Sequence, residues 1–170
     1  MELSQQGYGS CDTDTDEEGS DIPEGSRLSD IVPIESWCSC GLCIRLPSEI
    51  ENYCCRESTC LLDSILEAKG IPCVTEYQLF KTAIGNQEVL ELCAFGMDQR
   101  KLPVYKNGKI KPEGLRFTAY KNFLNMCGIR WIGKHRRYAL PACVIGEIRR
   151  LYPSGQYTAF KESQFSSRLE

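Results

Sequence analysis

Clustered cysteines constrain the fold of this chain more than any other feature of its sequence. Three of them occur within six residues, and an adjacent pair follows after a gap of ten residues. The cluster consists of Cys38, Cys40, Cys43, Cys54, Cys55, Cys60 and Cys73. Thiolates at such spacings are soft ligands of the kind that suits zinc. The stretch therefore predicts a metal-binding nucleus for a small domain.

A disulfide framework is the alternative explanation for so many cysteines. Residues 1–30 lack the basic start and apolar core of a signal peptide. The longest apolar run, residues 138–145, is shorter than the roughly 18 residues of a membrane span. We therefore expect a cytoplasmic protein, with the nucleus as the alternative, and in both places thiols stay reduced. The odd total of 11 cysteines also argues against complete pairing.

Charge and composition divide the chain. Residues 1–30 carry nine acidic side chains and one basic side chain, whereas the remainder has a net charge of +5. The acidic part has almost nothing to bury, so we expect residues 1–36 to form a disordered acidic tail. Residues 37–161 are expected to form one zinc-stabilised, cysteine-rich domain of the α+β class that is mainly helical. Residues 162–170 are expected to be a flexible carboxy terminus.

The adjacent cysteines Cys54 and Cys55 point to more than one metal ion. Ser48 and Glu51 have the spacing of a capping box, which predicts a helix that carries both cysteines. Adjacent side chains on a helix diverge by about 100°, so a single tetrahedral ion is poorly placed to take both as terminal ligands. A two-metal site with a shared thiolate accommodates them.

Apolar periodicity and turn residues predict the other elements. A second capping box begins at Thr75, and Gly70 and Gly128 are expected helix stops. Helices are expected over residues 61–69, 76–93, 117–127 and 141–152, the second of them with a pause at Gly85-Asn86. A hairpin or loop is expected around Asn107-Gly108, and a short strand over residues 129–133.

Cys143 is the expected distant ligand of the cysteine cluster. It lies in the first turn of the helix that begins at Pro141, where free amides and the helix dipole stabilise a thiolate. A metal bond to Cys143 would join the carboxy-terminal part of the chain to the cluster. Cys93 lies among leucines and is expected to be a small core residue.

Several separated motifs resemble a known family. They are Trp37-Cys38-x-Cys40-Gly41-x-Cys43, Cys54-Cys55-Arg56, Cys73-x-Thr75, Leu115-Arg116 with Ala119-Tyr120, Leu140-Pro141-x-Cys143, Ile148-Arg149 and Gly155-Gln156-Tyr157-x-x-Phe160-Lys161. In order and spacing, over about residues 37–161, they are similar to the intracellular "ballast" domain at the carboxy terminus of the subtype-seven purinergic ATP-gated ion channel. Channel spans and the extracellular ATP-binding region have no counterpart here, so we expect a stand-alone relative of the domain without channel activity.

The resemblance implies a cluster of two zinc ions per chain. The ligand positions of the family are matched by Cys38, Cys40, Cys43, Cys54, Cys55, Cys73 and Cys143. Seven thiolates need one bridging sulfur to give each ion four ligands. Seven thiolates and two zinc ions together carry a net charge of −3, so nearby cations are expected. Cys60 lies in an insertion and is an alternative ligand, whereas Cys11 and Cys127 are expected bystanders.

The resemblance also implies a guanine-nucleotide pocket that would take GDP or GTP. The family's contact positions are matched by Arg116, Tyr120 and Leu140. Three other positions differ from the channel, which has histidine, arginine and lysine where this chain has Phe117, Ile145 and Ser154, respectively. The loss of two cations removes charge that would hold a diphosphate.

Two other function classes follow from the residues. Residues 115–161 contain nine Lys and Arg side chains against Glu147, interleaved with aromatics, which makes nucleic-acid binding the alternative function. An enzyme is not expected, because an all-thiolate shell leaves no open metal position and the sequence has no Ser-His-Asp, H-x-E or P-loop pattern. His135, the single histidine, lies among cations and is expected at the surface. The expected function is that of a zinc-binding interaction module.

Overall fold

The fold is mainly helical with two small sheets, in agreement with the expected α+β class. The structure is a computed structural model that describes residues 25–58, 60–96, 105–106, 109–129, 136–155, 157, 160 and 165–169. Its α-helices are α1 (Leu61–Ala68), α2 (Gln78–Phe80), α3 (Gln87–Phe95), α4 (Pro112–Met126) and α5 (Ala142–Leu151). Short helical turns are η1 (Ile34–Ser36), η2 (Glu49–Glu51), η3 (Cys55–Glu57) and η4 (Val74–Glu76), and η5 (Lys81–Gly85) is π-helical. The strands are β1 (Tyr105–Lys106), β2 (Lys109–Ile110), β3 (Arg136–Tyr138) and β4 (Phe165–Ser167).

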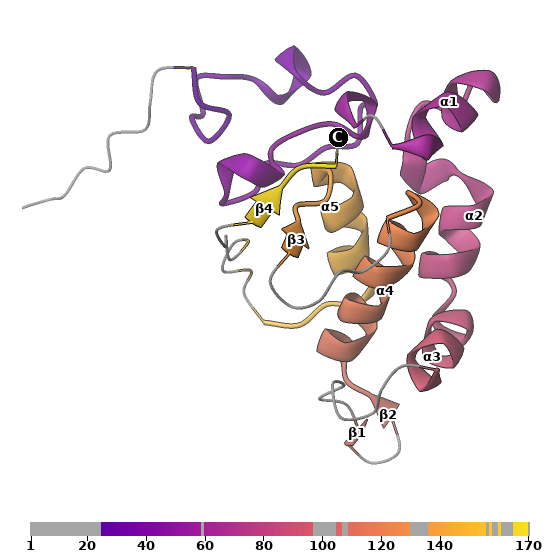
Figure 1. Cartoon of the computed structure of the whole chain (residues 1–170). Helices are drawn as coiled ribbons and strands as arrows, with labels where there is room; N and C mark the ends of the chain where they lie inside the picture. Colours follow the sequence, from indigo (N-terminus) through magenta and orange to yellow (C-terminus); the bar gives the residue numbers. More distant parts are fainter. Residues whose placement is uncertain are drawn as a thin grey trace, which may run out of the picture.

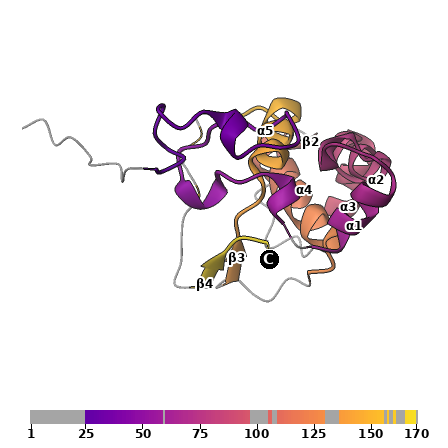
Figure 2. The same ribbon diagram turned by 90° about the horizontal axis from the view of Figure 1, so that it is seen from above.

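Helix α4 lies in the middle of the helical layer. Figures 1 and 2 show α1, α2 and α3 on one side of α4 and α5 on the other. The rings of Phe80 and Phe123 meet edge to face with centroids 6.1 Å apart, which joins α2 to α4. Asn122 donates to the carbonyl of Ala83 over 2.8 Å, and Tyr152 donates to that of Ile84 over 2.6 Å. The π-helical turn is thereby held to α4 and α5.

The helix boundaries show which stop and capping residues are used in the structure. Gly128 has φ 74°, a left-handed conformation that glycine tolerates, and α4 ends just before it as expected. Asn86 caps α3 by accepting from the amides of Glu88 and Val89. The capping box expected at Thr75 is absent, because Thr75 bonds the sulfur of Cys73 at 3.2 Å instead.

The chain from Pro47 onward does not form the helix that the sequence predicted for Cys54 and Cys55. It forms the two separate turns η2 and η3, and Ser48 makes no side-chain cap. Instead, Glu57 accepts from the Cys54 amide over 2.7 Å and closes a capping box around η3. Each cysteine therefore has its own backbone environment.

Two pairs of strands complete the fold. The expected hairpin is present, because β1 and β2 pair antiparallel with Lys106 opposite Lys109. Strand β3 pairs parallel with β4, so that Arg136 lies opposite Phe165. The strand expected over residues 129–133 falls largely outside the described residues.

The carboxy terminus takes part in the domain, in contrast to the flexible segment expected over residues 162–170. Beyond β4, Leu169 is 1% exposed in the core. Arg168 donates to the carbonyls of Glu49 and Ile50 over 3.0 Å and lies 5.1 Å from the ring centre of Tyr53. A three-residue strand and a single buried leucine have too little periodicity to be found from sequence.

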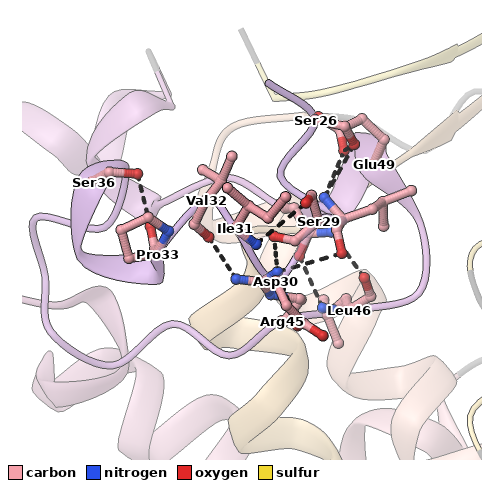
Figure 3. A network of polar contacts seen from close by, with 12 residues as sticks. Ser26, Ser29, Asp30, Ile31, Val32, Pro33, Ser36, Arg45, Leu46 and Glu49 are labelled. Atoms are coloured by element: carbon pink, nitrogen blue, oxygen red, sulfur yellow. Dashed lines mark hydrogen bonds and ion pairs between the residues drawn. The ribbon is translucent and has the colours of Figure 1, made fainter. Parts of the chain in front are cut away.

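The end of the expected tail also contacts the domain. Arg27 forms two hydrogen bonds with the Glu57 carboxylate, at 2.8 and 2.9 Å, and lies 5.2 Å from the ring centre of Trp37. Arg45 donates to the carbonyls of Ser29 and Val32 (Figure 3). Residues 25–36 thus pack on the domain, and the rest of the expected tail lies outside the described residues.

Among the described residues, no helix combines the length and the apolar character that a membrane crossing requires.

Candidate metal centre

The first group of sulfurs comes from the loop after Trp37 and from the start of η3. Its members are Cys38, Cys40, Cys43 and Cys54, whose Sγ atoms all lie within 4.8 Å of one another. The Sγ atom of Cys40 is 3.8 Å from that of Cys38 and 3.7 Å from that of Cys43. Gly41, with φ 77°, provides the left-handed residue with which the loop turns between these cysteines.

The second group joins four distant parts of the chain. Its members are Cys40, Cys55, Cys73 and Cys143, again with all Sγ atoms within 4.8 Å of one another. The sulfurs of Cys55 and Cys73 are 4.0 Å apart, and all four side chains are buried. Cys40 belongs to both groups. Seven thiols therefore form two sets of four, with the sulfur of Cys40 in common.

These separations fit tetrahedral metal sites. A Zn–S bond of about 2.3 Å places sulfurs on the edges of a tetrahedron about 3.8 Å long. The Sγ–Sγ distances of 3.7, 3.8 and 4.0 Å within the groups are close to that value. A disulfide would bring its sulfurs to about 2 Å, and all ten cysteines among the described residues are free. The donor set suits a soft or borderline ion, and zinc is the commonest ion in four-sulfur sites.

Hydrogen bonds among the thiols perturb their acidity. The bond with Cys40 lowers the pKa of Cys54, and the bond with Cys143 lowers the pKa of Cys73 and of Cys40. The same bond with Cys40 raises the pKa of Cys143, to which burial also contributes. Thiolates this close repel one another, so in the absence of a metal some of the sulfurs retain their protons. Divalent ions would relieve that repulsion.

Two side chains hold the loops that carry the sulfurs. Asn52 is fully buried, accepts from the Leu46 amide over 2.8 Å and donates to the carbonyls of Leu46 and Ser48. Tyr53 donates to the Ala139 carbonyl over 2.6 Å, and its own carbonyl accepts from the Ala142 amide. The second contact places the first turn of α5, and with it Cys143, beside the cysteine loop. Figure 1 shows residues 37–58 lying next to that end of α5.

Arg56 holds the loop that carries Cys73. It donates to the carbonyl of Pro72 over 3.1 Å and to that of Ile71, and pairs with Asp63 at 3.4 Å. Because Arg56 directly follows Cys55 in the chain, it also puts a positive charge beside the cluster, as the expected negative charge of the site requires.

The remaining cysteines lie outside both groups. Cys93 is half-buried on α3, and Cys11 lies outside the described residues. Cys60, the alternative ligand, is in neither group and packs against the core that contains Cys127.

The three residues expected to contact a nucleotide line one cavity. Arg116, Tyr120 and Leu140 surround a space of about 180 Å³, together with Ile145 and Arg149. Burial and the nearby Arg149 lower the pKa of Arg116. The guanidinium of Arg149 lies 4.3 Å from the ring centre of Tyr157. The cavity thus combines an apolar wall with two arginines.

Polar groups around the cavity already have protein partners. Arg116 donates to the Tyr152 carbonyl over 2.9 Å and to the Ser154 hydroxyl over 3.0 Å. The Tyr120 hydroxyl donates to the carbonyl of Tyr138 and accepts from its amide, both over 3.0 Å. A ligand would therefore compete with Ser154 for Arg116.

The described part of residues 115–161 gives no support to nucleic-acid binding. Two of its aromatics, Phe123 and Tyr152, are 2% and 5% exposed and belong to the core. Arg150 pairs with Glu147 at 2.7 Å. The basic run Lys134-His135 lies outside the described residues.

Comparison with known proteins gives one finding. The family described as the P2X purinoreceptor 7 intracellular domain matches residues 10–161 of the 170-residue chain. The match includes all seven cysteines of the two sulfur groups and every residue of the cavity. A search of curated proteins found no match.

Proposed function

The chain belongs to the family of P2X purinoreceptor 7 intracellular domains, and from this premise we propose that it is a zinc-binding, non-enzymatic interaction module held together by a two-ion cysteine cluster. The observation that carries the proposal is that seven thiols form two groups of four with Cys40 in common. In the proposal Cys38, Cys43 and Cys54 bind one ion, Cys55, Cys73 and Cys143 bind the other, and Cys40 bridges them. An intracellular location accords with the family's description.

The cluster would connect parts of the chain that are far apart in sequence. Cys55 and Cys73 lie on either side of α1, and Cys143 lies in the first turn of α5. Bonds from these sulfurs to one ion close two loops, of which the longer spans about seventy residues. Bound zinc would have a closed four-sulfur shell without a site for water or substrate, so its contribution is structural.

Native mass spectrometry of the purified chain tests the metal content. We expect the folded chain to carry two zinc ions and the acid-denatured chain to carry none, because acid protonates the ligand thiolates. A Cys93→Ser variant serves as the control and should retain both ions, since Cys93 lies outside the sulfur groups. A folded chain with fewer than two ions, or with another metal at full occupancy, would contradict the proposal.

A guanine nucleotide is the second proposal, and the cavity favours it. The expected contact residues all line the same cavity, namely Arg116, Tyr120 and Leu140. Arg149 supplies a second cation there. Two arginines can bind phosphate oxygens through paired hydrogen bonds. An apolar surface such as Leu140 and Ile145 suits the flat face of a base.

Thermal denaturation with added nucleotides tests this second proposal. GDP or GTP should raise the melting temperature, because a ligand that binds the native state stabilises it. ATP should leave the melting temperature unchanged, since the proposed ligand is a guanine nucleotide. Arg116→Ala should abolish the response by removing a cation of the cavity. Arg150→Ala is the matched control, since that arginine points to solvent with 68% of its side chain exposed and pairs with Glu147. An unchanged melting temperature with GDP and GTP would reject the nucleotide and leave the zinc proposal intact.

A further inference from the structure

The two sulfur groups differ in how far they are open to solvent. In the first group, Cys38 and Cys43 are partly exposed. Leu42 and Ile44, which flank Cys43 in the chain, are 48% and 44% exposed. In the second group, all four cysteines are 0% to 7% exposed. A reagent in solution can therefore approach the first group directly, whereas the second group lies in the core.

The groups also differ in which parts of the chain they hold together. The first group comes from a single stretch, residues 38–54. That stretch has support of its own, because Asn52 accepts from the Leu46 amide and Arg45 donates to carbonyls of the preceding segment (Figure 3). The second group draws on four separate parts of the chain and closes longer loops. Loss of the first ion would thus free one loop, whereas loss of the second would release the connection between α5 and the loops around α1.

The shared sulfur of Cys40 allows the groups to lose their ions one at a time. Cys40 is a member of both groups. When only the second ion is bound, Cys40 is an ordinary terminal ligand, and that ion still has four sulfurs. Four thiolates are a complete shell for zinc. The second site therefore does not depend on occupation of the first.

A hydroxyl contact gives the second group further protection. The Oγ1 atom of Thr75 lies 3.2 Å from the sulfur of Cys73. In the first group, the Oγ atom of Ser39 lies 3.8 Å from the sulfur of Cys54. Because a metal-bound thiolate carries no proton, the hydroxyl is the donor in each contact. A donated hydrogen bond takes up part of the negative charge of the sulfur and stabilises the bound form, and the shorter of the two contacts lies in the buried group.

We propose that the first sulfur group is an exchangeable metal site and the second a permanent one in which Thr75 shields Cys73, an inference that rests on the proposed two-ion cluster. The exchange partner is a soft donor from solution, such as a small thiol or a chelator. Its donor atoms replace the sulfurs of Cys38, Cys43 and Cys54 one at a time, and each released sulfur takes a proton from solvent at neutral pH. No electrons are transferred. The chain can then give up and take up one ion through residues 38–54 while the second ion keeps the domain folded.

Time-resolved native mass spectrometry with a limited amount of chelator tests the order of release. The two-zinc chain should pass through a one-zinc species that keeps a cooperative thermal transition. A pulse of N-ethylmaleimide marks the thiols that are free at each time, and cleavage after Lys and Arg separates the members of the two groups into peptides. At the one-zinc stage, two labels should lie on residues 28–45 and one on residues 46–56. Residues 70–81 and 138–149, which contain Cys73 and Cys143, should stay unlabelled.

Substitution of Thr75 tests the hydroxyl contact. Thr75→Val removes the donor to Cys73 but keeps the shape of the side chain, so release of the second ion should become roughly tenfold faster or more. The first step should be unchanged. Thr75→Ser keeps the hydroxyl and should restore the original rate. Ser39→Ala is the matched control, since it removes the hydroxyl of the first group and should leave the second step unchanged.

Several results would overturn the inference. Label on residues 70–81 or 138–149 at the one-zinc stage would mean that the buried group loses its ion first. Loss of both ions in one step would mean that the groups are not independent, and a one-zinc species without a cooperative transition would mean that the first ion is needed for folding. Equal rates for Thr75→Val and the unchanged chain would contradict the shielding of Cys73. A chain that starts with fewer than two zinc ions would instead reject the proposed function, and this inference with it.

Discussion

Removing the metal with a strong chelator should abolish the cooperative thermal transition of the protein. The thiols of the second group are 0% to 7% exposed, so the metal-free chain would hold repelling or protonated sulfurs in its core. Structural zinc contributes about 10–16 kcal/mol in small metal-binding peptides, which is comparable to the whole stability of a small domain, about 5–15 kcal/mol. Differential scanning calorimetry before and after chelation measures the loss.

Zinc added back to the chelated sample should restore the transition, which separates metal loss from irreversible damage. Lower pH should act in the same direction as the chelator, because protons compete with the ion for the thiolates. Magnesium at the same concentration is the matched control and should restore nothing, since it prefers oxygen ligands. A chelated chain that keeps a sharp transition would show that the cluster is not needed for folding.

Cys40→Ser should lose both metal ions, whereas Cys38→Ser and Cys73→Ser should each affect one. Cys40 is common to the two sulfur groups, while Cys38 belongs to the first alone and Cys73 to the second alone. A serine hydroxyl stays protonated at neutral pH and is a poor substitute for a bridging thiolate. The loss of stability should be well above the 1 kcal/mol typical of a point mutation. Metal analysis of the three purified variants measures the difference.

Replacement by cadmium provides a second readout for the same variants, because the charge-transfer absorption of thiolate-bound cadmium rises with the number of bound sulfurs. We expect the largest decrease for Cys40→Ser and smaller, similar decreases for the other two. Equal effects in all three variants would mean that Cys40 does not bridge, and that the two groups depend on one another through folding alone.

The sequence by itself determined the chemistry of the candidate site. Spacing near Cys38 and Cys54 placed soft donors close together, and the position of Cys143 in a first helical turn marked it as a distant member of the same set. These are local features, since spacing and helix phase are properties of a few consecutive residues. The hairpin around Asn107-Gly108 and the helix stop at Gly128 were predicted correctly for the same reason.

Tertiary structure alone decided which sulfur belongs to both groups. The sequence pointed to a shared thiolate through the adjacent pair, yet Cys54 and Cys55 fall into different groups and Cys40 is the common member. The expected helix over this pair was wrong, because Glu57 closes a capping box on Cys54 and the turn η3 takes its place. Choice among neighbouring donors depends on where separate loops meet, and residue spacing does not contain that information.

Contacts over long sequence distances were likewise beyond the reach of local patterns. The bonds of Arg27 and Arg45 with residues up to thirty positions away and the buried Leu169 leave no periodic trace. Local patterns reflect the energetics of single turns and strands, whereas these contacts depend on which distant segments the fold brings together. The sequence thus determined which atoms are suited to bind metal, and the packing of the helices decided which of them meet.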